Sequence, residues 1–414
     1  MEYGLIGEHL GHSFSKEIHG LIADYDYCLQ EVAKEDLPAF LKKAAFKGIN
    51  VTIPYKEAVI PYLDGIDEGA KLIGAVNTIV NDQGRLFGYN TDYLGMIALF
   101  EHAGIEVKGT KALIFGSGGT SKTARAVLKQ LGAKEIYVFS RKAAGDYLGY
   151  DELAAHYDAD IIVNTTPCGM YPHNYETITD LRAFEALKGV IDVIYNPLRS
   201  SLVRQALALG IKAEGGLYML VAQAFYAAEK FLNKNLAEAK LQACFNKVIE
   251  AKQNIILTGM PGSGKTTIGK ALSALLKRPF IDTDEYLVNK YQRSITEIFA
   301  SEGEAAFRAY EHEVIKEVSA LSGHVIATGG GAILSKKNID YFKQNGRIYF
   351  LDRPLADLLP TEDRPLASTK AAIKQRYQER IAIYRDSADV IIANNDTIAM
   401  AIEKIGKEHS KWKY

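Results

Sequence analysis

The sequence predicts an α/β protein with two units, each built on a parallel sheet that ends at a glycine-rich loop. Two observations support this prediction. An apolar run at 112–115 leads into Gly116, Gly118 and Gly119, and a second apolar run at 255–257 leads into the pattern G-x-x-x-x-G-K-[ST] at 259–266. Both loops are followed by helical spacing, and this order of strand, loop and helix is typical of folds that bind phosphate groups. Because the second loop begins so late in 414 residues, another unit must fill the first half.

Composition narrows the classes of function. Hydrophobic residues make up 48% and charged residues 24% of the chain, and the net charge of −1 offers no field to attract nucleic acid or a membrane. Cys28, Cys168 and Cys244 are widely spaced, which predicts neither a disulfide framework nor a zinc site and favours a cytoplasmic location. We expect no signal peptide, and the most apolar stretch, 216–228, is too short to span a bilayer. Small molecules are the expected partners, with no nucleic acid, no membrane and no obligate protein partner.

Four short polar motifs follow one another in the first 92 residues. They are centred on Ser13 and Ser15, on Thr52 and Lys56, on Asn77, and on Asp92. Each is also what an ordinary turn carries, and a lone lysine at a strand end is usually solvated. A strand end is nevertheless where α/β proteins place their sites.

In this order the motifs resemble the shikimate dehydrogenase family, which carries H-S-x-S, N-V-T-x-P-x-K-E, G-A-V-N-T and N-T-D segments. The resemblance extends from Leu5 to about Ile249 and implies reduction of 3-dehydroshikimate to shikimate, with Lys56 and Asp92 at the reacting carbon. An ammonium held by a carboxylate is a suitable proton donor to the alkoxide that hydride transfer creates. The resemblance also implies the following substrate-binding residues: Ser13, Ser15, Thr52, Asn77, Asp92, Tyr195 and Gln223.

The cofactor of the first unit is indicated by the residues after the strand at 136–139, which completes a βαβ unit. An NAD site would present Asp or Glu about 20 residues beyond the glycines. This chain has Ser140, Arg141 and Lys142 there, and two cations suit the 2′-phosphate of NADP(H), although a solvated basic turn is the alternative. The family's N-R-T motif agrees, with Arg141 carrying most of the discrimination. The predicted cofactor-binding residues are Gly116, Gly118, Gly119, Thr120, Ser140, Arg141, Lys142, Thr165, Gly216 and Met219, the last of which could equally fill the core.

The pattern at 259–266 predicts binding of ATP or GTP. Its glycines let backbone N–H groups face phosphate oxygens, Lys265 can reach the β- and γ-phosphates, and the Thr266 hydroxyl can bind Mg²⁺. Asp282 and Asp284 follow a short apolar run and point the same way on an extended chain. They could serve Mg²⁺ and a substrate hydroxyl, or be surface acids.

The later motifs, D-x-D, G-E-x-x-F-R, G-G-G, R-P-L and R-x-x-x-Y, resemble shikimate kinase over residues 254–405. This resemblance implies transfer of phosphate from ATP to shikimate, with Asp284, Lys265 and the lid residue Arg364 acting on the reaction. It also implies that Asp282 and Thr266 bind Mg²⁺. The implied shikimate-binding residues are Asp284, Arg308, Gly330 and Arg380. The implied nucleotide-binding residues are Gly262, Ser263, Gly264, Lys265, Thr266 and Thr267.

Together these features predict a bifunctional enzyme of chorismate and aromatic amino acid biosynthesis. The fold we expect is a two-lobed dehydrogenase with an NADP-binding Rossmann domain, followed by a P-loop kinase domain. The expected division is 1–92 with 215–249 for the substrate-binding lobe, 93–214 for the Rossmann domain, 250–254 for a linker and 255–414 for the kinase, with 406–414 as a polar tail. Two alternatives stay open: one half could be an inactive shikimate-binding or assembly module, or the first half could be a quinate dehydrogenase that uses NAD.

Overall fold

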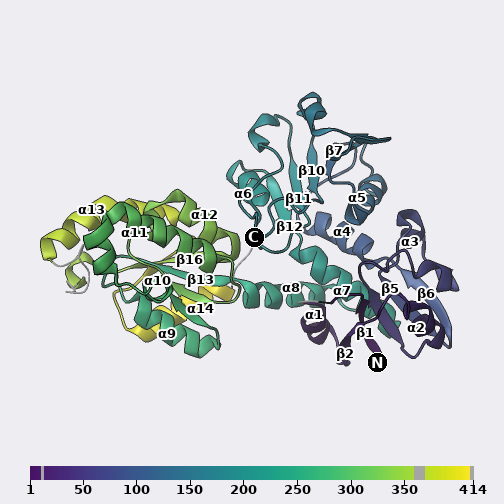
Figure 1. Ribbon diagram of the computed structural model, residues 1–414, viewed down its shortest axis with the longest axis horizontal. Helices are drawn as coiled ribbons and strands as arrows, with labels where there is room; N and C mark the ends of the chain where they lie inside the picture. Colours follow the sequence, from purple (N-terminus) through teal and green to yellow (C-terminus); the bar gives the residue numbers. More distant parts are fainter. Residues whose placement is uncertain (11–13, 359–368, 411–414) are drawn as a thin grey trace. The chain divides into compact units, whose positions relative to one another are not determined.

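The computed structural model describes residues 1–10, 14–358 and 369–410 (Figure 1). The chain divides into two compact units, Met1–Val248 and Ile249–Tyr414. Within the described residues, none of the helices combines the length and the apolar character needed to cross a membrane.

The first unit begins with a mixed six-stranded sheet in the order β2-β1-β3-β5-β6-β4. Its strands are β1 (Tyr3–Gly7), β2 (Tyr27–Glu31), β3 (Gly48–Val51), β4 (Gly65–Ile66), β5 (Thr78–Asp82) and β6 (Arg85–Tyr89). Strand β1 runs parallel to β2 and β3, whereas β5 runs antiparallel to β3 and β6. Helices α1 (Ser15–Ile22), α2 (Leu37–Lys43) and α3 (Glu68–Ile73) connect these strands. Three parallel strand ends therefore lie together, and the Lys56 loop follows one of them.

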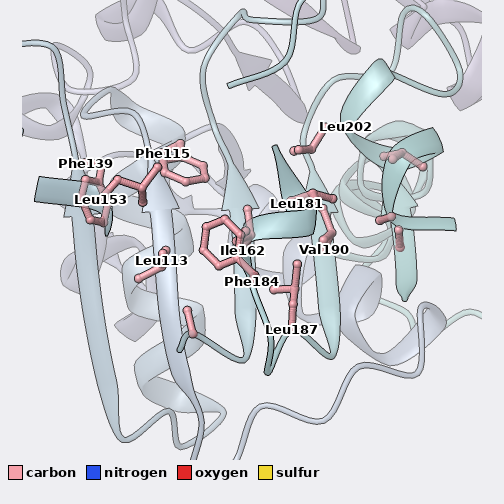
Figure 2. Packing of buried hydrophobic residues seen from close by; sticks show 14 residues of the cluster. Leu113, Phe115, Phe139, Leu153, Ile162, Leu181, Phe184, Leu187, Val190 and Leu202 are labelled. Atoms are coloured by element: carbon pink, nitrogen blue, oxygen red, sulfur yellow. The ribbon is translucent and has the colours of Figure 1, made fainter. Parts of the chain in front are cut away.

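The second sheet of this unit is parallel in every pair and has the order β12-β11-β10-β7-β8-β9. Its strands are β7 (Lys111–Phe115), β8 (Glu135–Phe139), β9 (Tyr147–Leu148), β10 (Ile161–Asn164), β11 (Gly189–Asp192) and β12 (Lys212–Gly215), with helices α5 (Gly119–Gln130) and α6 (Ser201–Ala208) between them. The central strands read as continuous apolar runs because helices cover such sheets on both faces. Figure 2 shows the core on one face, where Leu113, Ile162 and Val190 pack with Phe115 and Phe184. The predicted α/β fold with parallel sheets is confirmed.

Two long helices join the sheets of the first unit. Helix α4 (Thr91–His102) packs against α7 (Leu217–Leu232), and α7 also contacts α1, β3 and β5. Gly95 lies at their closest approach, since a Cβ there would come within 2.9 Å of the Met219 carbonyl oxygen. The expected lobe boundary at 92/93 falls inside α4, so the two lobes share a helix across it.

The second unit has one five-stranded parallel sheet in the order β14-β15-β13-β16-β17. Its strands are β13 (Asn254–Thr258), β14 (Phe280–Asp282), β15 (Val325–Ala327), β16 (Gly346–Asp352) and β17 (Val390–Ala393). Its helices are α9 (Lys265–Leu276), α10 (Thr283–Tyr291), α11 (Ile295–Ser319), α12 (Lys336–Asn345), α13 (Lys370–Ser387) and α14 (Ile398–Ser410). The predicted P-loop architecture with a central parallel sheet is present.

Two segments that the sequence led us to expect as irregular belong mostly to regular secondary structure. The expected linker at 250–254 is occupied by the last turn of α8 (Glu238–Lys252) and the start of β13. The expected polar tail is helical as far as Ser410, where α14 buries Ile405 and His409 against the sheet. In both places the segment is polar overall, and tertiary contacts rather than an apolar pattern of its own decide the structure.

Candidate active sites

A pocket of about 290 Å³ lies in the first unit, between the ends of β1, β3 and β11 and helix α7. Most of the residues predicted to bind substrate or to react line it together: Ser15, Thr52, Lys56, Asn77, Asp92, Tyr195 and Gln223. Three of the predicted cofactor residues, Thr120, Gly216 and Met219, line the same pocket. Ser13 lies outside the described residues. Motifs that are far apart in the sequence thus meet at one cavity.

Lys56 and Asp92 form an ion pair in this pocket, with 2.6 Å between Nζ and Oδ2. Asp92 is in the first turn of α4, which Asn90 caps by accepting a hydrogen bond from the Tyr93 N–H. A carboxylate in a first helical turn is favoured by the helix dipole. The Lys56 carbonyl accepts a hydrogen bond from the Val76 N–H at 2.8 Å, which anchors the loop that carries the lysine. The pair is therefore fixed from both sides while about a quarter to a third of each side chain stays exposed.

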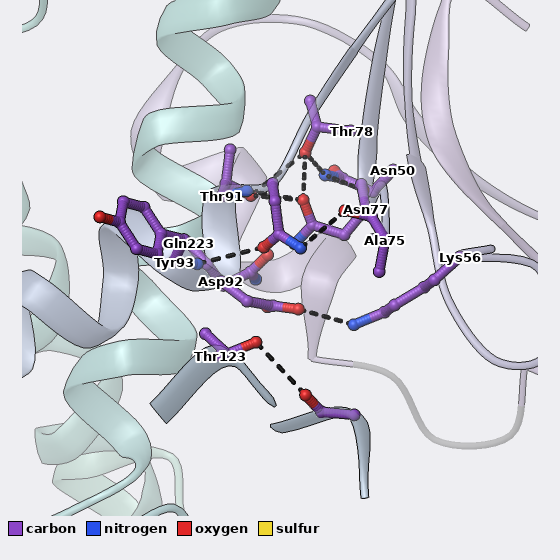
Figure 3. A network of polar contacts seen from close by, with 12 residues as sticks. Asn50, Lys56, Ala75, Asn77, Thr78, Thr91, Asp92, Tyr93, Thr123 and Gln223 are labelled. Carbon is purple, nitrogen blue, oxygen red and sulfur yellow. Dashed lines mark hydrogen bonds and ion pairs between the residues drawn. The ribbon is translucent and has the colours of Figure 1, made fainter. Parts of the chain in front are cut away.

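Behind the pair, buried polar side chains form a network (Figure 3). Asn77 Oδ1 accepts hydrogen bonds from the Thr91 N–H at 2.7 Å and from the Thr78 hydroxyl at 3.0 Å. Asn50 Nδ2 donates to the Thr78 hydroxyl at 3.0 Å. Because the Asn77 oxygen is already bonded, its amide nitrogen is the group that it offers to the pocket. Such a satisfied network holds the pocket wall in one conformation.

The glycine loop after β7 fits a dinucleotide. A methyl group placed on Gly118 or Gly119 would meet no other heavy atom within 4 Å, so their outer faces are open to a ligand at the start of α5. Gly116 has φ +108°, and a Cβ there would lie 2.6 Å from the Thr165 hydroxyl. A pyrophosphate would find backbone N–H groups and a helix N-terminus at this edge.

The residues predicted to read the adenosine ribose follow β8, the strand next to β7. Ser140 is buried, and its hydroxyl lies 3.0 Å from that of Ser117 in the glycine loop and accepts from the Lys142 N–H. Arg141 and Lys142 are exposed beside it. Ser140 thus joins the two loops, while the two cations are left accessible to an anion.

In the second unit, Lys265 is buried within the phosphate loop. Its Nζ donates to the carbonyl oxygens of Gly259 at 2.8 Å and Met260 at 3.1 Å. Gly262 and Gly264 have φ +82° and +88°, a conformation that glycine adopts without strain. The Ser263 hydroxyl is buried without a hydrogen-bond partner among the described residues, as a group awaiting an acceptor would be. The loop therefore fits a nucleotide phosphate, and Thr267 lies exposed on the first turn of α9.

Asp282 organises the side of this site that the sequence predicts to bind Mg²⁺. Its Oδ2 accepts a hydrogen bond from the Thr266 hydroxyl at 2.7 Å, and its Oδ1 accepts from the Asp284 N–H at 3.1 Å and so caps α10. No group of three or more potential metal-ligating side chains exists in the described part of the chain. A hydroxyl and one carboxylate nevertheless suit Mg²⁺, which keeps waters and takes its other ligands from phosphates.

The predicted acid-binding residues surround the glycine turn at 329–331. Arg380 Nη1 donates to the Gly330 carbonyl at 3.0 Å, and a Cβ on Gly331 would overlap the Arg308 guanidinium. A Cβ on Gly329 would overlap the Asp284 carboxylate. A larger residue at either position would displace one of these side chains from the glycine turn. Arg364 falls outside the described residues.

Comparison with known proteins decides the family of the first unit. The family described as shikimate dehydrogenase substrate binding domain matches residues 5–79. The shikimate dehydrogenase (NADP(+)) of Clostridium perfringens strain 13 is 38% identical over 245 residues, which is 55% of this chain and 90% of that protein. That of Halothermothrix orenii is 40% identical over 258 residues, covering 54% and 88%. The chain belongs to the shikimate dehydrogenase family.

Solved structures agree with this family. A chorismate mutase/shikimate 5-dehydrogenase fusion protein from Clostridium acetobutylicum has a TM-score of 0.57 and 38% identity, over 59% of this chain and 96% of that one. A Thermus thermophilus shikimate 5-dehydrogenase in complex with NADP(H) and shikimate has a TM-score of 0.52 and 27% identity, over 60% and 99%. The family described as shikimate kinase matches residues 261–409. The chain is thus a shikimate dehydrogenase fused to a shikimate kinase, an NADP-dependent oxidoreductase and a phosphotransferase of one pathway.

The shikimate dehydrogenase unit contains two polar residues that belong to the family motifs but were assigned no role from the sequence. Asn50 lines the pocket and accepts a hydrogen bond from the Tyr27 hydroxyl at 2.7 Å. Its signal was its place two residues before Thr52 on an extended chain, which puts both on one face. Asp192 is fully buried and accepts hydrogen bonds from the Ser200 hydroxyl at 2.5 Å and from Asn164 Nδ2 at 3.1 Å.

Burial raises the pKa of the Asp192 carboxyl to about 7, against the lowering effect of its hydrogen bonds. This carboxyl ties the loop after β10, which carries Thr165, to the loop after β11, which carries Tyr195. Asp192 therefore links the ends of two adjacent strands behind the pocket wall.

In the shikimate kinase unit the missed residue is Glu311. Its Oε2 accepts a hydrogen bond from Arg308 Nη1 at 2.8 Å, one helical turn away on α11, and its Oε1 is buried without a partner among the described residues. Burial raises the pKa of the Glu311 carboxyl, although the neighbouring Arg308 guanidinium acts to lower it. The spacing of three residues from Arg308 was the available signal. Glu311 orients the arginine toward the glycine turn.

Proposed function

We propose that the first unit reduces 3-dehydroshikimate to shikimate with NADPH, and that the second transfers the γ-phosphoryl group of ATP to the 3-hydroxyl of shikimate in the presence of Mg²⁺. The observation that carries the proposal is the Lys56–Asp92 ion pair inside a pocket that gathers the family's polar motifs. In the second unit, the phosphate loop beside Asp284 and the two arginines supports the proposed phosphoryl transfer.

In the dehydrogenase reaction, the chain must hold a small cyclic acid and give a proton to its carbonyl oxygen. NADPH supplies the hydride. Lys56 is the proton donor, and Asp92 holds the ammonium and a substrate hydroxyl in place. Ser13, Ser15, Thr52, Asn77, Tyr195 and Gln223 bind the remaining hydroxyls and the carboxylate. This arrangement removes the alkoxide charge as it forms.

The cofactor is held by the residues along one edge of the parallel sheet. Gly116, Gly118, Gly119 and Thr120 face the pyrophosphate, and Arg141, supported by Ser140 and Lys142, faces the 2′-phosphate. Thr165, Gly216 and Met219 stand at the nicotinamide. We propose the substrate-binding lobe as 1–92 with 215–249 and the NADP-binding domain as 93–214, with 255–414 as the kinase.

In the kinase reaction, positioning and charge neutralisation matter more than covalent help. ATP with Mg²⁺ supplies the phosphoryl group. Arg308, Arg380 and the Gly330 backbone hold the shikimate carboxylate, and Asp284 orients the 3-hydroxyl and accepts its proton. Thr266 and Asp282 hold the metal, residues 262–267 cradle the phosphates, and Lys265 and Arg364 neutralise the transferring group.

The preference for NADPH tests the cofactor assignment. Arg141→Ala is expected to raise KM for NADPH by about tenfold or more, because a charge-assisted bidentate bond contributes about 1.5–3 kcal/mol. KM for NADH should change little, since NADH lacks the phosphate. Initial rates with both cofactors, and Arg125→Ala as an exposed control on α5, provide the comparison. An unchanged NADPH/NADH ratio would instead favour the quinate-type, NAD-using alternative.

Two assays on the full chain test the function itself. One follows NADPH consumption that depends on 3-dehydroshikimate, and the other follows ADP formation that depends on shikimate. We expect both activities. The retained Lys56, Asp92, Lys265 and Asp284 favour two active sites over one active half and one binding module, and absence of either activity would support the module instead.

A further inference from the structure

We propose that Tyr384 is a positioning residue that couples the nucleotide site of the kinase unit to its shikimate site. This inference rests on the proposed kinase function and adds to it a linkage between the two ligands. It comes from one juxtaposition: the Tyr384 hydroxyl touches the phosphate loop and the glycine turn at once.

The contacts are short and buried. The Tyr384 hydroxyl lies 2.9 Å from the Gly259 carbonyl oxygen and 2.6 Å from the Gly330 carbonyl oxygen, and the side chain is fully buried. Each carbonyl has a second donor. Lys265 Nζ donates to Gly259 at 2.8 Å, and Arg380 Nη1 donates to Gly330 at 3.0 Å. The phosphate-binding lysine and the carboxylate-binding arginine are thus connected through a single hydroxyl.

A hydroxyl has one proton, so it can donate fully to only one of two carbonyls. Burial raises the pKa of the Tyr384 hydroxyl, which therefore keeps that proton at neutral pH. The ring is held by stacking on Phe350, with centroids 5.1 Å apart and planes 9° apart. The hydroxyl is consequently fixed between its two acceptors, and only the choice of acceptor can change.

Nucleotide binding changes that choice. When Lys265 turns to the phosphates, the Gly259 carbonyl loses one donor and becomes the better acceptor for Tyr384. The Gly330 carbonyl then relies on Arg380, which strengthens the bond that fixes this guanidinium beside the glycine turn. An arginine held in place loses less freedom when it binds a carboxylate, so bound ATP should tighten shikimate binding. By linkage, shikimate should tighten ATP binding equally.

The variant Tyr384→Phe separates this role from a structural one. Without nucleotide, both carbonyls keep their other donors and the ring keeps its stacking on Phe350, so neither acceptor is left buried and unbonded. Tyr377→Phe is the matched control, because Tyr377 lies two turns earlier on α13 and packs against the same apolar cluster.

The test is the matrix of initial kinase rates over ATP and shikimate concentrations, measured on the full chain without NADP(H). In the wild type and in Tyr377→Phe, saturating ATP should lower KM for shikimate by about fivefold, the low end of typical coupling. In Tyr384→Phe this factor should fall to about one, while KM for shikimate at low ATP stays within about twofold of wild type.

Two results would overturn the coupling role: a wild-type factor of one, or a Tyr384→Phe factor equal to that of the wild type. Failure of the proposed kinase function is a different result, because the wild type would then not phosphorylate shikimate at any ATP concentration.

Discussion

Replacement of Lys56 by alanine is expected to lower kcat for 3-dehydroshikimate reduction by about 10²–10⁴-fold, the usual worth of a general acid. The variant removes the ammonium 2.6 Å from Asp92 and with it the proposed proton donor. Phosphorylation of added shikimate should stay at the wild-type rate, because the kinase residues belong to the other unit. Steady-state rates of both reactions on one preparation provide the measurement.

Lys71→Ala is the matched control for this variant, since Lys71 is an exposed lysine on α3 whose ion pair with Glu68 spans 4.0 Å. It should leave both rates unchanged. If Lys56→Ala kept the wild-type reduction rate, another group would have to donate the proton. If a folded Lys56→Ala lost both activities, the two sites would not be independent.

Asp284→Asn should produce a loss of similar size in the other reaction. The amide keeps the shape of the side chain beside the glycine turn but cannot accept the proton of the 3-hydroxyl, so kcat for phosphorylation is expected to fall by about 10²–10⁴-fold. KM for ATP should change by less than about threefold, because Lys265 and the phosphate loop are untouched. Reduction of 3-dehydroshikimate should proceed at the wild-type rate.

Glu285→Gln, an exposed neighbour on the same helix, tests whether any loss of charge at the start of α10 has this effect. This variant should leave the rates of both reactions unchanged. An Asp284→Asn enzyme that phosphorylates shikimate at the wild-type rate would show that the carboxylate does not take the proton.

The sequence predicted those loops, strands and helices that are recognisable from a short run of consecutive residues. The two glycine loops stand between apolar runs and helices, and the parallel sheets around them follow from that order. The Lys56–Asp92 pairing came from motifs of a family and could not have come from spacing, since the residues are 36 positions apart. Their meeting depends on β3 and β6 lying on either side of β5, which only the folded sheet decides.

The residues that were missed act through neighbours distant in the chain. Asp192 bonds Asn164 because β10 and β11 are adjacent, and its burial on all sides is a product of packing. Glu311 faces Arg308 rather than solvent because α11 turns that side toward the glycine turn. The helix at 406–410 has a related cause. It continues α14 from Ile405, which packs against the sheet, and the Nδ1 atom of the buried His409 lies 3.2 Å from the Tyr349 hydroxyl of β16.

We propose that the two sites act as independent catalysts of consecutive steps. Shikimate released by the first unit should therefore pass through solution before the second unit binds it. A transient pool of shikimate is expected in the combined reaction, at the level given by the separate rates. If the pool were absent while both rates were normal, direct transfer between the sites would be required.

The most direct test supplies wild-type protein with 3-dehydroshikimate, NADPH and Mg-ATP in one vessel and follows all three acids by mass spectrometry. We predict that 3-dehydroshikimate disappears, that shikimate rises and falls, and that shikimate 3-phosphate accumulates with one NADPH and one ATP consumed per molecule. The central claim would be contradicted if no shikimate 3-phosphate formed from 3-dehydroshikimate under these conditions.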